Sequence, residues 1–147
     1  QDQHGHQGQR RRRSSSFPIS GFLFFVFVVL GKGIVEGLKV ASSSWDNTVR
    51  VWDVGTGETE LVYDGHSGWV YSAQWSPDGL KVASCGGDNT VRVWDVGTGE
   101  TELVYDGHSS SVLLAEWSPD GLKVASSSSD NTVRVWDVGT GETELVY

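Results

Sequence analysis

The chain contains two sets of side chains that could do nucleophilic chemistry, 42 residues apart: His66, Ser84 and Asp88, then His108, Ser126 and Asp130. Each set has the composition of a nucleophile, a general base and an orienting carboxylate. The sequence G-x-S-x-G, which presents the nucleophilic serine of many hydrolases, surrounds neither Ser84 nor Ser126. Catalysis also needs no second copy of its residues. We therefore expect both sets to be structural and expect no catalytic residue, with a hydrolase as the alternative.

Both sets lie inside a block that the chain repeats with a period of 42 residues. The segments 37–63, 79–105 and 121–147 each read GLKVAS, three variable residues, and then DNTVRVWDVGTGETELVY. Self-similarity at a fixed period is typical of a repeat fold. We expect the constant residues to specify that fold and the variable residues to determine function.

Each repeat predicts four short β-strands and no helix. In the middle copy, residues 91–96 are β-branched and aromatic, with apolar side chains at both parities, as in a strand buried on both faces. Ser-Pro-Asp-Gly at 76–79 has the chemistry of a type I turn, and Asp-Asn at 88–89 that of a second tight turn. The strands predicted for this copy are 69–75, 80–85, 90–96 and 101–105.

Gly-His and Trp-Asp pairs accompany the predicted strands. The pairs are Gly-His at 65–66 and 107–108, and Trp-Asp at 52–53, 94–95 and 136–137. On these motifs, residues 37–147 resemble the WD-repeat (WD40) β-propeller family, whereas residues 1–36 do not. The resemblance implies an all-β fold, a partial β-propeller of four-stranded antiparallel blades, with about two complete blades plus most of a third.

The resemblance also implies a hydrogen-bond network in each blade that links a His, a strand Ser, a turn Asp and a Trp. The matching residues are His66, Ser84, Asp88 and Trp94, then His108, Ser126, Asp130 and Trp136. Such a network is physically reasonable because a buried imidazole and a buried indole N–H both need partners. The first copy has Ser42, Asp46 and Trp52 but Phe24 at the histidine position, so we expect its network to be incomplete.

Two short stretches differ between the copies. One is the three residues before the turn Asp, and the other follows the Gly-His pair, HSGWVYSAQWSPD at 66–78 against HSSSVLLAEWSPD at 108–120. In a propeller both stretches lie on one rim, which in the resembled family commonly binds proteins. Exposed Trp and Tyr are enriched at binding hot spots. The predicted partner-binding rim consists of Trp45, Trp69, Tyr71, Ser72, Gln74, Gly87, Ser111, Leu113, Leu114, Glu116 and Ser129.

Neutral drift of exposed residues is the alternative explanation of this variation. Drift would also change other polar positions, yet Thr56 and Glu58 are identical in all three copies. Differences confined to one rim therefore favour recognition.

The charge distribution excludes some partners. The net charge is -8, but residues 1–36 contain five Lys or Arg against two acidic residues, and residues 37–147 contain six against seventeen. An acidic repeat region repels phosphate backbones, so we expect no nucleic-acid partner. His4 and His6 lack the spacing of a metal module, and no phosphate-binding Gly-rich loop occurs, so we expect no metal and no cofactor. The single Cys85 suits a reducing compartment, and we expect the cytoplasm.

The first 36 residues form two further segments. Residues 1–16 are polar and basic and are expected to be a disordered tail, although the Arg run at 10–13 leaves a nuclear location as an alternative. The apolar part of residues 17–36 spans about fourteen residues, fewer than the roughly 20 that cross a bilayer as a helix. Three interpretations stay open for it: a signal or membrane anchor, a degenerate first strand of the first repeat, or non-native sequence. Val28 falls one period before Val70, which slightly favours the strand.

Together these features predict a non-catalytic scaffold for protein–protein interaction that binds through the variable rim. A membrane-tethered binding module that uses residues 17–30 is the alternative. Closed propellers typically have four to eight blades. We therefore expect the chain to be a piece of a longer protein, and its partners to include the remaining blades of that protein or further copies of this chain.

Overall fold

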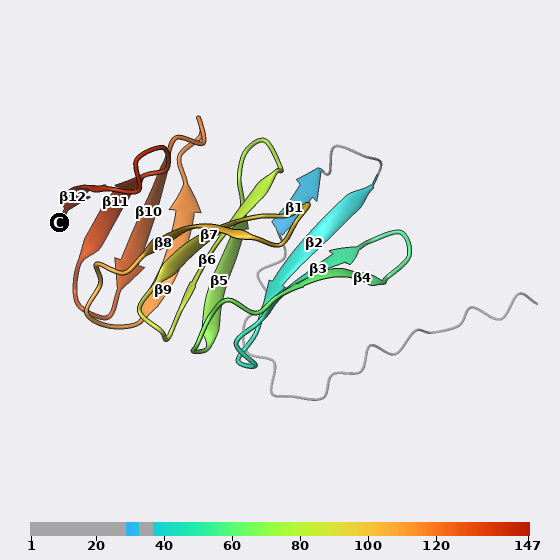
Figure 1. Ribbon diagram of the computed structural model, residues 1–147, viewed down its shortest axis with the longest axis horizontal. Helices are drawn as coiled ribbons and strands as arrows, with labels where there is room; N and C mark the ends of the chain where they lie inside the picture. Colours follow the sequence, from blue (N-terminus) through green and yellow to red (C-terminus); the bar gives the residue numbers. More distant parts are fainter. Residues whose placement is uncertain (1–28, 33–36) are drawn as a thin grey trace, which may run out of the picture.

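The computed structural model describes residues 29–32 and 37–147, which form twelve strands in three antiparallel sheets (Figure 1). The first sheet contains β1 (Val29–Lys32), β2 (Leu38–Ser43), β3 (Val49–Asp53) and β4 (Thr59–Tyr63). The second contains β5 (Val70–Trp75), β6 (Lys81–Gly86), β7 (Val91–Asp95) and β8 (Thr101–Tyr105). The third contains β9 (Val112–Trp117), β10 (Lys123–Ser128), β11 (Val133–Asp137) and β12 (Thr143–Val146).

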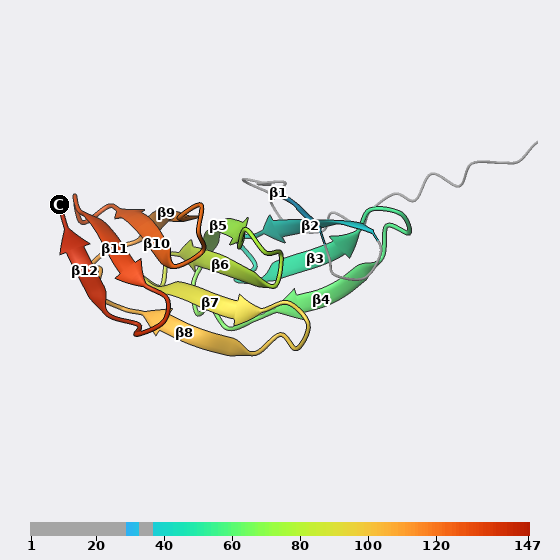
Figure 2. The ribbon, with the colours of Figure 1, turned by 90° about the horizontal axis from the view of Figure 1, so that it is seen from above.

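Each sheet is one blade, because its four strands lie side by side in chain order. The blades follow one another in a row, with β1, β5 and β9 along one edge and β4, β8 and β12 along the other (Figure 2). The all-β fold and the four-stranded blades are therefore confirmed. Each strand of the middle copy begins and ends within one residue of its predicted position.

The Asp-Asn turns have the predicted chemistry. Asn47, Asn89 and Asn131 have φ angles of 71°, 66° and 67°, in the left-handed region that Asn tolerates better than most residues. In the middle copy, Asp88 Oδ1 accepts hydrogen bonds from Thr90 N (3.1 Å) and Thr90 Oγ1 (2.8 Å). The Asp side chain thus closes the turn between β6 and β7.

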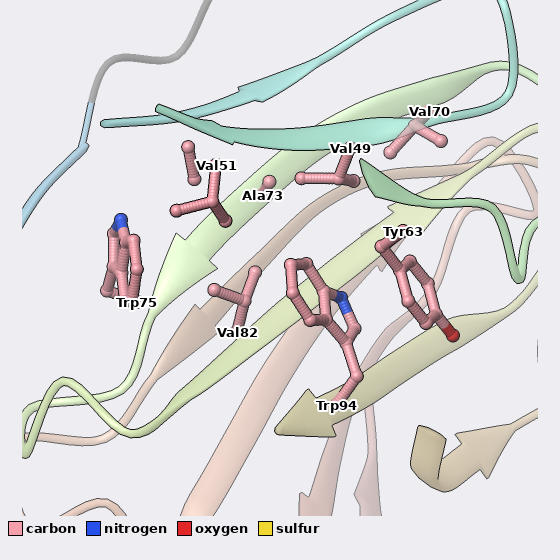
Figure 3. Close-up of a cluster of buried hydrophobic side chains, with 9 residues drawn as sticks. Val49, Val51, Tyr63, Val70, Ala73, Trp75, Val82 and Trp94 are labelled. Carbon is pink, nitrogen blue, oxygen red and sulfur yellow. The ribbon is translucent and has the colours of Figure 1, made fainter. Parts of the chain in front are cut away.

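Two apolar clusters fill the spaces between the blades. The first joins Ala41, Val49, Val51 and Tyr63 of the first blade to Val70, Ala73, Trp75, Val82 and Trp94 of the second (Figure 3). The second joins Ala83, Cys85, Val91, Val93 and Tyr105 of the second blade to Val112, Ala115, Val124 and Trp136 of the third. This arrangement explains why β7 has apolar side chains on both faces of its sheet: Val91 and Val93 face the third blade, and Trp94 faces the first.

A Tyr–Trp pair lies at each of these two interfaces. The Tyr63 and Trp94 rings stack with their centroids 4.5 Å apart and an angle of 4° between their planes (Figure 3). The Tyr105 and Trp136 rings stack with their centroids 4.6 Å apart and an angle of 25°. The Tyr63 hydroxyl lies 2.6 Å from Thr101 Oγ1 of the next blade. Each Tyr therefore contributes apolar contact area and fixes the alignment of adjacent blades.

The third blade has an uncovered apolar face among the described residues. Val133 is 41% exposed and Tyr147 is 74% exposed, whereas their counterparts Val91 and Tyr105 are 0% and 2% exposed. The segments 88–105 and 130–147 are identical, so the difference comes from the third blade, which covers this face of the second. We call this surface the open face: Ala125, Val133, Val135, Leu145 and Tyr147.

Strand β1 lies in the segment 17–36 and pairs with β2, with Val29 opposite Ala41. A strand at this position agrees with the degenerate-first-strand interpretation. The tail at 1–16 and the remainder of the apolar segment, 17–28 and 33–36, lie outside the described residues, so the expectations for them remain predictions. No helix in the described part of the chain is long and apolar enough to cross a membrane.

The blade interfaces predict unequal effects for one substitution made in two copies. Val91→Ala should lower the free energy of unfolding by about 2 kcal/mol, because it removes two buried methyl groups and leaves a cavity. In the monomeric chain, Val133→Ala should change it by less than about 0.5 kcal/mol, because that side chain is then partly in water. Urea denaturation of both variants tests the comparison. Equal losses would show that the open face is covered in solution.

Candidate functional site

Four residues of the middle blade form a continuous hydrogen-bond network. His66, in the loop before β5, has Nδ1 at 2.9 Å from Asp88 Oδ2 and Nε2 at 2.7 Å from Ser84 Oγ on β6. Trp94 on β7 donates its Nε1–H to the same Ser84 oxygen over 3.1 Å. His66, Ser84 and Trp94 are all buried. The residues predicted to form a network in this blade are thus brought together.

The third blade repeats this geometry. His108 Nδ1 lies 2.8 Å from Asp130 Oδ2, and His108 Nε2 lies 2.8 Å from Ser126 Oγ. Trp136 Nε1 donates to Ser126 Oγ over 2.7 Å. Two copies with one geometry indicate that the network belongs to the blade rather than to a single reaction site.

The network leaves each serine oxygen fully engaged. If His66 Nδ1–H donates to the Asp88 carboxylate, Nε2 accepts the Ser84 hydroxyl proton, and the serine oxygen accepts the Trp94 indole N–H. Ser84 is 0% exposed. A substrate therefore has no access to this oxygen in the structure, although the His–Ser–Asp arrangement resembles that of a hydrolase.

The network also attaches the loop before β5 to the turn after β6. Asp88 Oδ2 accepts the Ser67 backbone N–H (3.1 Å) in addition to its contact with His66. Burial alone would raise the pKa of Asp88, but hydrogen bonds from His66 and Thr90 and the favourable electrostatic interaction with His66 outweigh burial and hold the pKa well below its usual value of 3.8. Hydrogen bonds from Thr132, followed by those from His108 and Ser109, outweigh burial in the same way and lower the pKa of Asp130.

The first blade retains part of the network. Trp52 Nε1 donates to Ser42 Oγ over 2.8 Å, and Asp46 Oδ1 accepts from Thr48 N (3.0 Å). The histidine position, residue 24, lies outside the described residues, so the incompleteness of this network remains a prediction.

The aromatic residues of the predicted rim come together where the first and second blades meet. Trp45 stacks on Trp69 with ring centroids 4.5 Å apart and an angle of 12° between the planes. Trp69 is 49% exposed. A shallow, widely open hollow of about 360 Å³ adjoins Trp69 and is lined by Asn47, Ser67, Gly68, Trp69, Tyr71, Gly87 and Ser111.

Sequence reasoning missed three residues of this hollow: Asn47, Ser67 and Gly68. Asn47 and Ser67 are identical to their counterparts in the other copies, and constancy by itself predicts a purely structural role. Gly68 differs from its counterpart Ser110, a difference that could have identified it. Asn47 and Ser67 could have been found only from their positions, because they lie in the loops that contain Trp45 and Trp69.

The prediction that Ser72 lies on the rim is wrong, because its side chain is fully buried. Ser72 pairs with Cys85 and Gln74 pairs with Ala83 across β5 and β6. Since Cys85 and Ala83 pack against the third blade, Ser72 and Gln74 are on the sheet face that the third blade covers.

The remaining rim positions lie on the third blade. Leu114 and Glu116 are the counterparts of Ser72 and Gln74, so they belong to the face that no blade covers. Leu113 is 50% exposed, and the Ser129 N–H donates to the Ser111 carbonyl oxygen over 2.9 Å. The third blade thus has small or aliphatic residues where the second has Trp69 and Tyr71.

Comparison with protein families agrees with this geometry. The family model for the WD domain, G-beta repeat (WD40) matches residues 32–53, 57–95 and 99–137, more than half of the chain. The chain belongs to the WD-repeat family. Its resemblance to that family, drawn from the Gly-His and Trp-Asp pairs, is therefore confirmed.

The WD-repeat chain is also similar to short parts of several longer proteins. It is 44% identical over 44 residues to ribosome assembly protein 4 of Chaetomium thermophilum. This match covers 30% of this chain and 8% of that protein. It is 51% identical over 39 residues to mouse coronin-7; the match covers 26% of this chain and 4% of coronin-7. It is 47% identical over 38 residues to the mouse peroxisomal targeting signal 2 receptor; the match covers 26% of this chain and 12% of the receptor. The matches thus span only a small fraction of the length of these relatives.

Within the described parts of the WD repeats, no group of three or more His, Cys, Asp and Glu side chains is arranged to hold a metal ion. The expectation that the chain needs no metal or cofactor stays a prediction.

Removal of the network carboxylate should destabilise the fold in a pH-dependent way. Asp88→Asn should lower the free energy of unfolding by about 2 kcal/mol at neutral pH, because it weakens charge-assisted hydrogen bonds of a buried group. Asp88 has a lowered pKa in the folded state, so its ionised form stabilises the fold above the unfolded value of 3.8. That contribution is lost as the pH falls through the folded-state pKa, and the two proteins should converge there.

The matched control is Asp46→Asn, the same change in the first copy, where the carboxylate side chain is 49% exposed. Its effect should be clearly smaller. Urea denaturation across the acid range measures all three proteins. A loss for Asp88→Asn that is independent of pH would contradict the role assigned to its charge.

Proposed function

We propose that this WD-repeat chain is a non-catalytic scaffold that recognises protein partners through the rim around Trp45, Trp69 and Tyr71. One observation carries the proposal: residues that differ between otherwise identical copies form a stacked aromatic pair, Trp45 on Trp69, and the half-exposed Trp69 lies beside a hollow. Exposed aromatic side chains next to a concavity are typical of binding hot spots.

The comparisons support a binding role in general terms. Among the similar proteins, one is named as a receptor for a targeting signal and one as an assembly protein. Burial and full hydrogen bonding of Ser84 and Ser126 favour a scaffold over a hydrolase. The acidic composition of residues 37–147 favours protein partners over nucleic acids. The lone Cys85, which is buried, is compatible with the reducing cytoplasm that we propose as the location.

Exchange of residues between the copies provides the test of this rim. Trp69→Ser and Trp45→Ser introduce the residues that the third blade has at these positions, Ser111 and Ser129, so the blade fold should tolerate them. Each should weaken partner binding about tenfold or more, as loss of a hot-spot Trp does. The measurement is affinity capture followed by titration of the captured partner.

Leu80→Ser is the control, because Leu80 is 39% exposed in the β5–β6 turn at the opposite end of the blade. It should leave binding unchanged. Partners that are retained equally by the wild-type chain and by both Trp variants would rule out the rim as the recognition surface.

The open face supports a second proposal, that this surface packs against a further blade, which is a following blade in a longer chain or, for this chain on its own, a blade of a second copy. Its residues are identical to those by which the first and second blades each pack on the blade that follows. Association through it should therefore reuse the contacts of Val91 and Tyr105 with the third blade. A row of copies joined in this way is head-to-tail, and such an association closes only if its rotation permits.

Sedimentation at increasing concentration tests this association. The wild-type chain should associate, and Val133→Asp should abolish the association by placing a charge on the open face. Val104→Asp should not, because Val104 is 46% exposed on the outer strand β8, away from that face. A wild-type chain that stays monomeric at every concentration would contradict the proposal.

A further inference from the structure

The backbone on both sides of the first blade junction holds Trp69 in place. The Trp69 carbonyl oxygen accepts the Gly87 N–H over 2.7 Å, and the next residue, Val70, donates its N–H to the Ser44 carbonyl oxygen over 3.0 Å. The residue after Ser44 is Trp45, whose ring stacks on that of Trp69. The start of β5 is therefore fixed to turns of two blades, and the indole pair is positioned before any ligand arrives.

A glycine specific to this copy makes the close approach possible. A Cβ at Gly86 would lie 1.9 Å from the Trp69 carbonyl oxygen, so no other residue fits there without a shift of the backbone. In the third copy the same position is Ser128, which donates to the Ser110 carbonyl oxygen over 3.0 Å. Trp69 and Gly86 thus occur together in one copy and are absent together from the other.

The lining of the hollow is polar apart from its aromatic walls. Ser67, Asn47 and the Tyr71 hydroxyl are hydrogen-bonding groups of neutral charge. Exposed carboxylates lie in the two loops that supply the stacked rings: Asp46 follows Trp45, and Asp64 begins the loop that leads to Trp69. Asp46 lies 3.7 Å from Arg50, and Arg92 lies 3.8 Å from the buried Asp88, so the nearby arginines already face carboxylates of their own blades.

We propose that this hollow binds a lysine or arginine side chain of the partner polypeptide, with the cationic group over the exposed face of Trp69. The inference rests on the proposed function, and it specifies the chemistry that the rim recognises. Indole is the aromatic ring that attracts cations most strongly. Ser67, Asn47 and Tyr71 offer oxygen atoms to the cation's N–H donors, and the excess of acidic residues in 37–147 attracts a basic segment.

The chain contains a matched negative site. In the third blade, Ser111 and Leu113 stand where Trp69 and Tyr71 stand in the second, and Ser111 itself lies at the edge of the same hollow. The copies therefore predict one cation site at the first junction and none at the second.

A pair of short capped peptides tests the inference on the full chain. Both read Gly-Ser-X-Ser-Gly, where X is lysine in one and norleucine, which keeps the methylene groups without the charge, in the other. Titration is followed by NMR of the indole N–H signals, assigned with Trp45→Ser and Trp69→Ser. The lysine peptide should shift the Trp69 and Trp45 signals and bind about tenfold more tightly than the norleucine peptide. Trp69→Ser should abolish the shifts, and Leu80→Ser should not change them.

The remaining outcomes distinguish failure of the cation site from failure of the proposed function. Equal binding of the two peptides, or no binding of either, overturns the cation site. If partner capture still depends on Trp69 in that case, the rim stands as a recognition surface and only its assigned ligand is wrong. If the lysine peptide binds but partner capture is indifferent to Trp69, the cation site exists and the proposed function fails.

Discussion

The structure depends on the double role of one indole in the second blade and of its counterpart in the third. Trp94 stacks on Tyr63 of the preceding blade, and its N–H is hydrogen-bonded to Ser84 inside its own blade. From Ser84 the network continues through His66 to Asp88, which closes the β6–β7 turn. The packing between blades and the conformation of the rim loops are therefore linked through a single side chain. Trp136 has the same two roles in the third blade.

This linkage divides the polar residues of the repeat into two groups. His66, Ser84 and Asp88 satisfy one another in the interior, and since buried polar groups are costly to leave unpaired, they are committed to the fold. Trp69 lies outside the network, on the loop that the network attaches to the β6–β7 turn, and Trp45 of the first blade stacks on it. A rigid base with variable residues on its loops is the arrangement that recognition requires, because little conformational entropy is lost when a partner binds.

Much of this fold could be predicted from the chain, because the repeat shows which residues are constant and the turn residues mark the strand ends. The network was also predictable, from the family resemblance that the Gly-His and Trp-Asp pairs indicate, because each of its residues has a matching position in this chain. The burial of Ser72 was not predictable from the sequence. A bulge shifts the β5–β6 register between Val70 and Ser72 and so changes which side chains face the next blade. Nor could the sequence reveal that Gly86 and Trp69 approach so closely, since that contact depends on three-dimensional geometry rather than on a pattern.

The most direct test of the linkage is hydrogen exchange at the indole N–H groups, measured by NMR in the wild-type chain and in Asp88→Asn. Trp94 is fully buried and hydrogen-bonded, whereas Trp69 is half-exposed. The account predicts that Trp94 exchanges far more slowly than Trp69, and that Asp88→Asn accelerates exchange at Trp94 while Trp136 keeps its rate. Exchange at Trp94 that is unaffected by the loss of the Asp88 charge would contradict the claim that the network joins the rim turn to the blade interface.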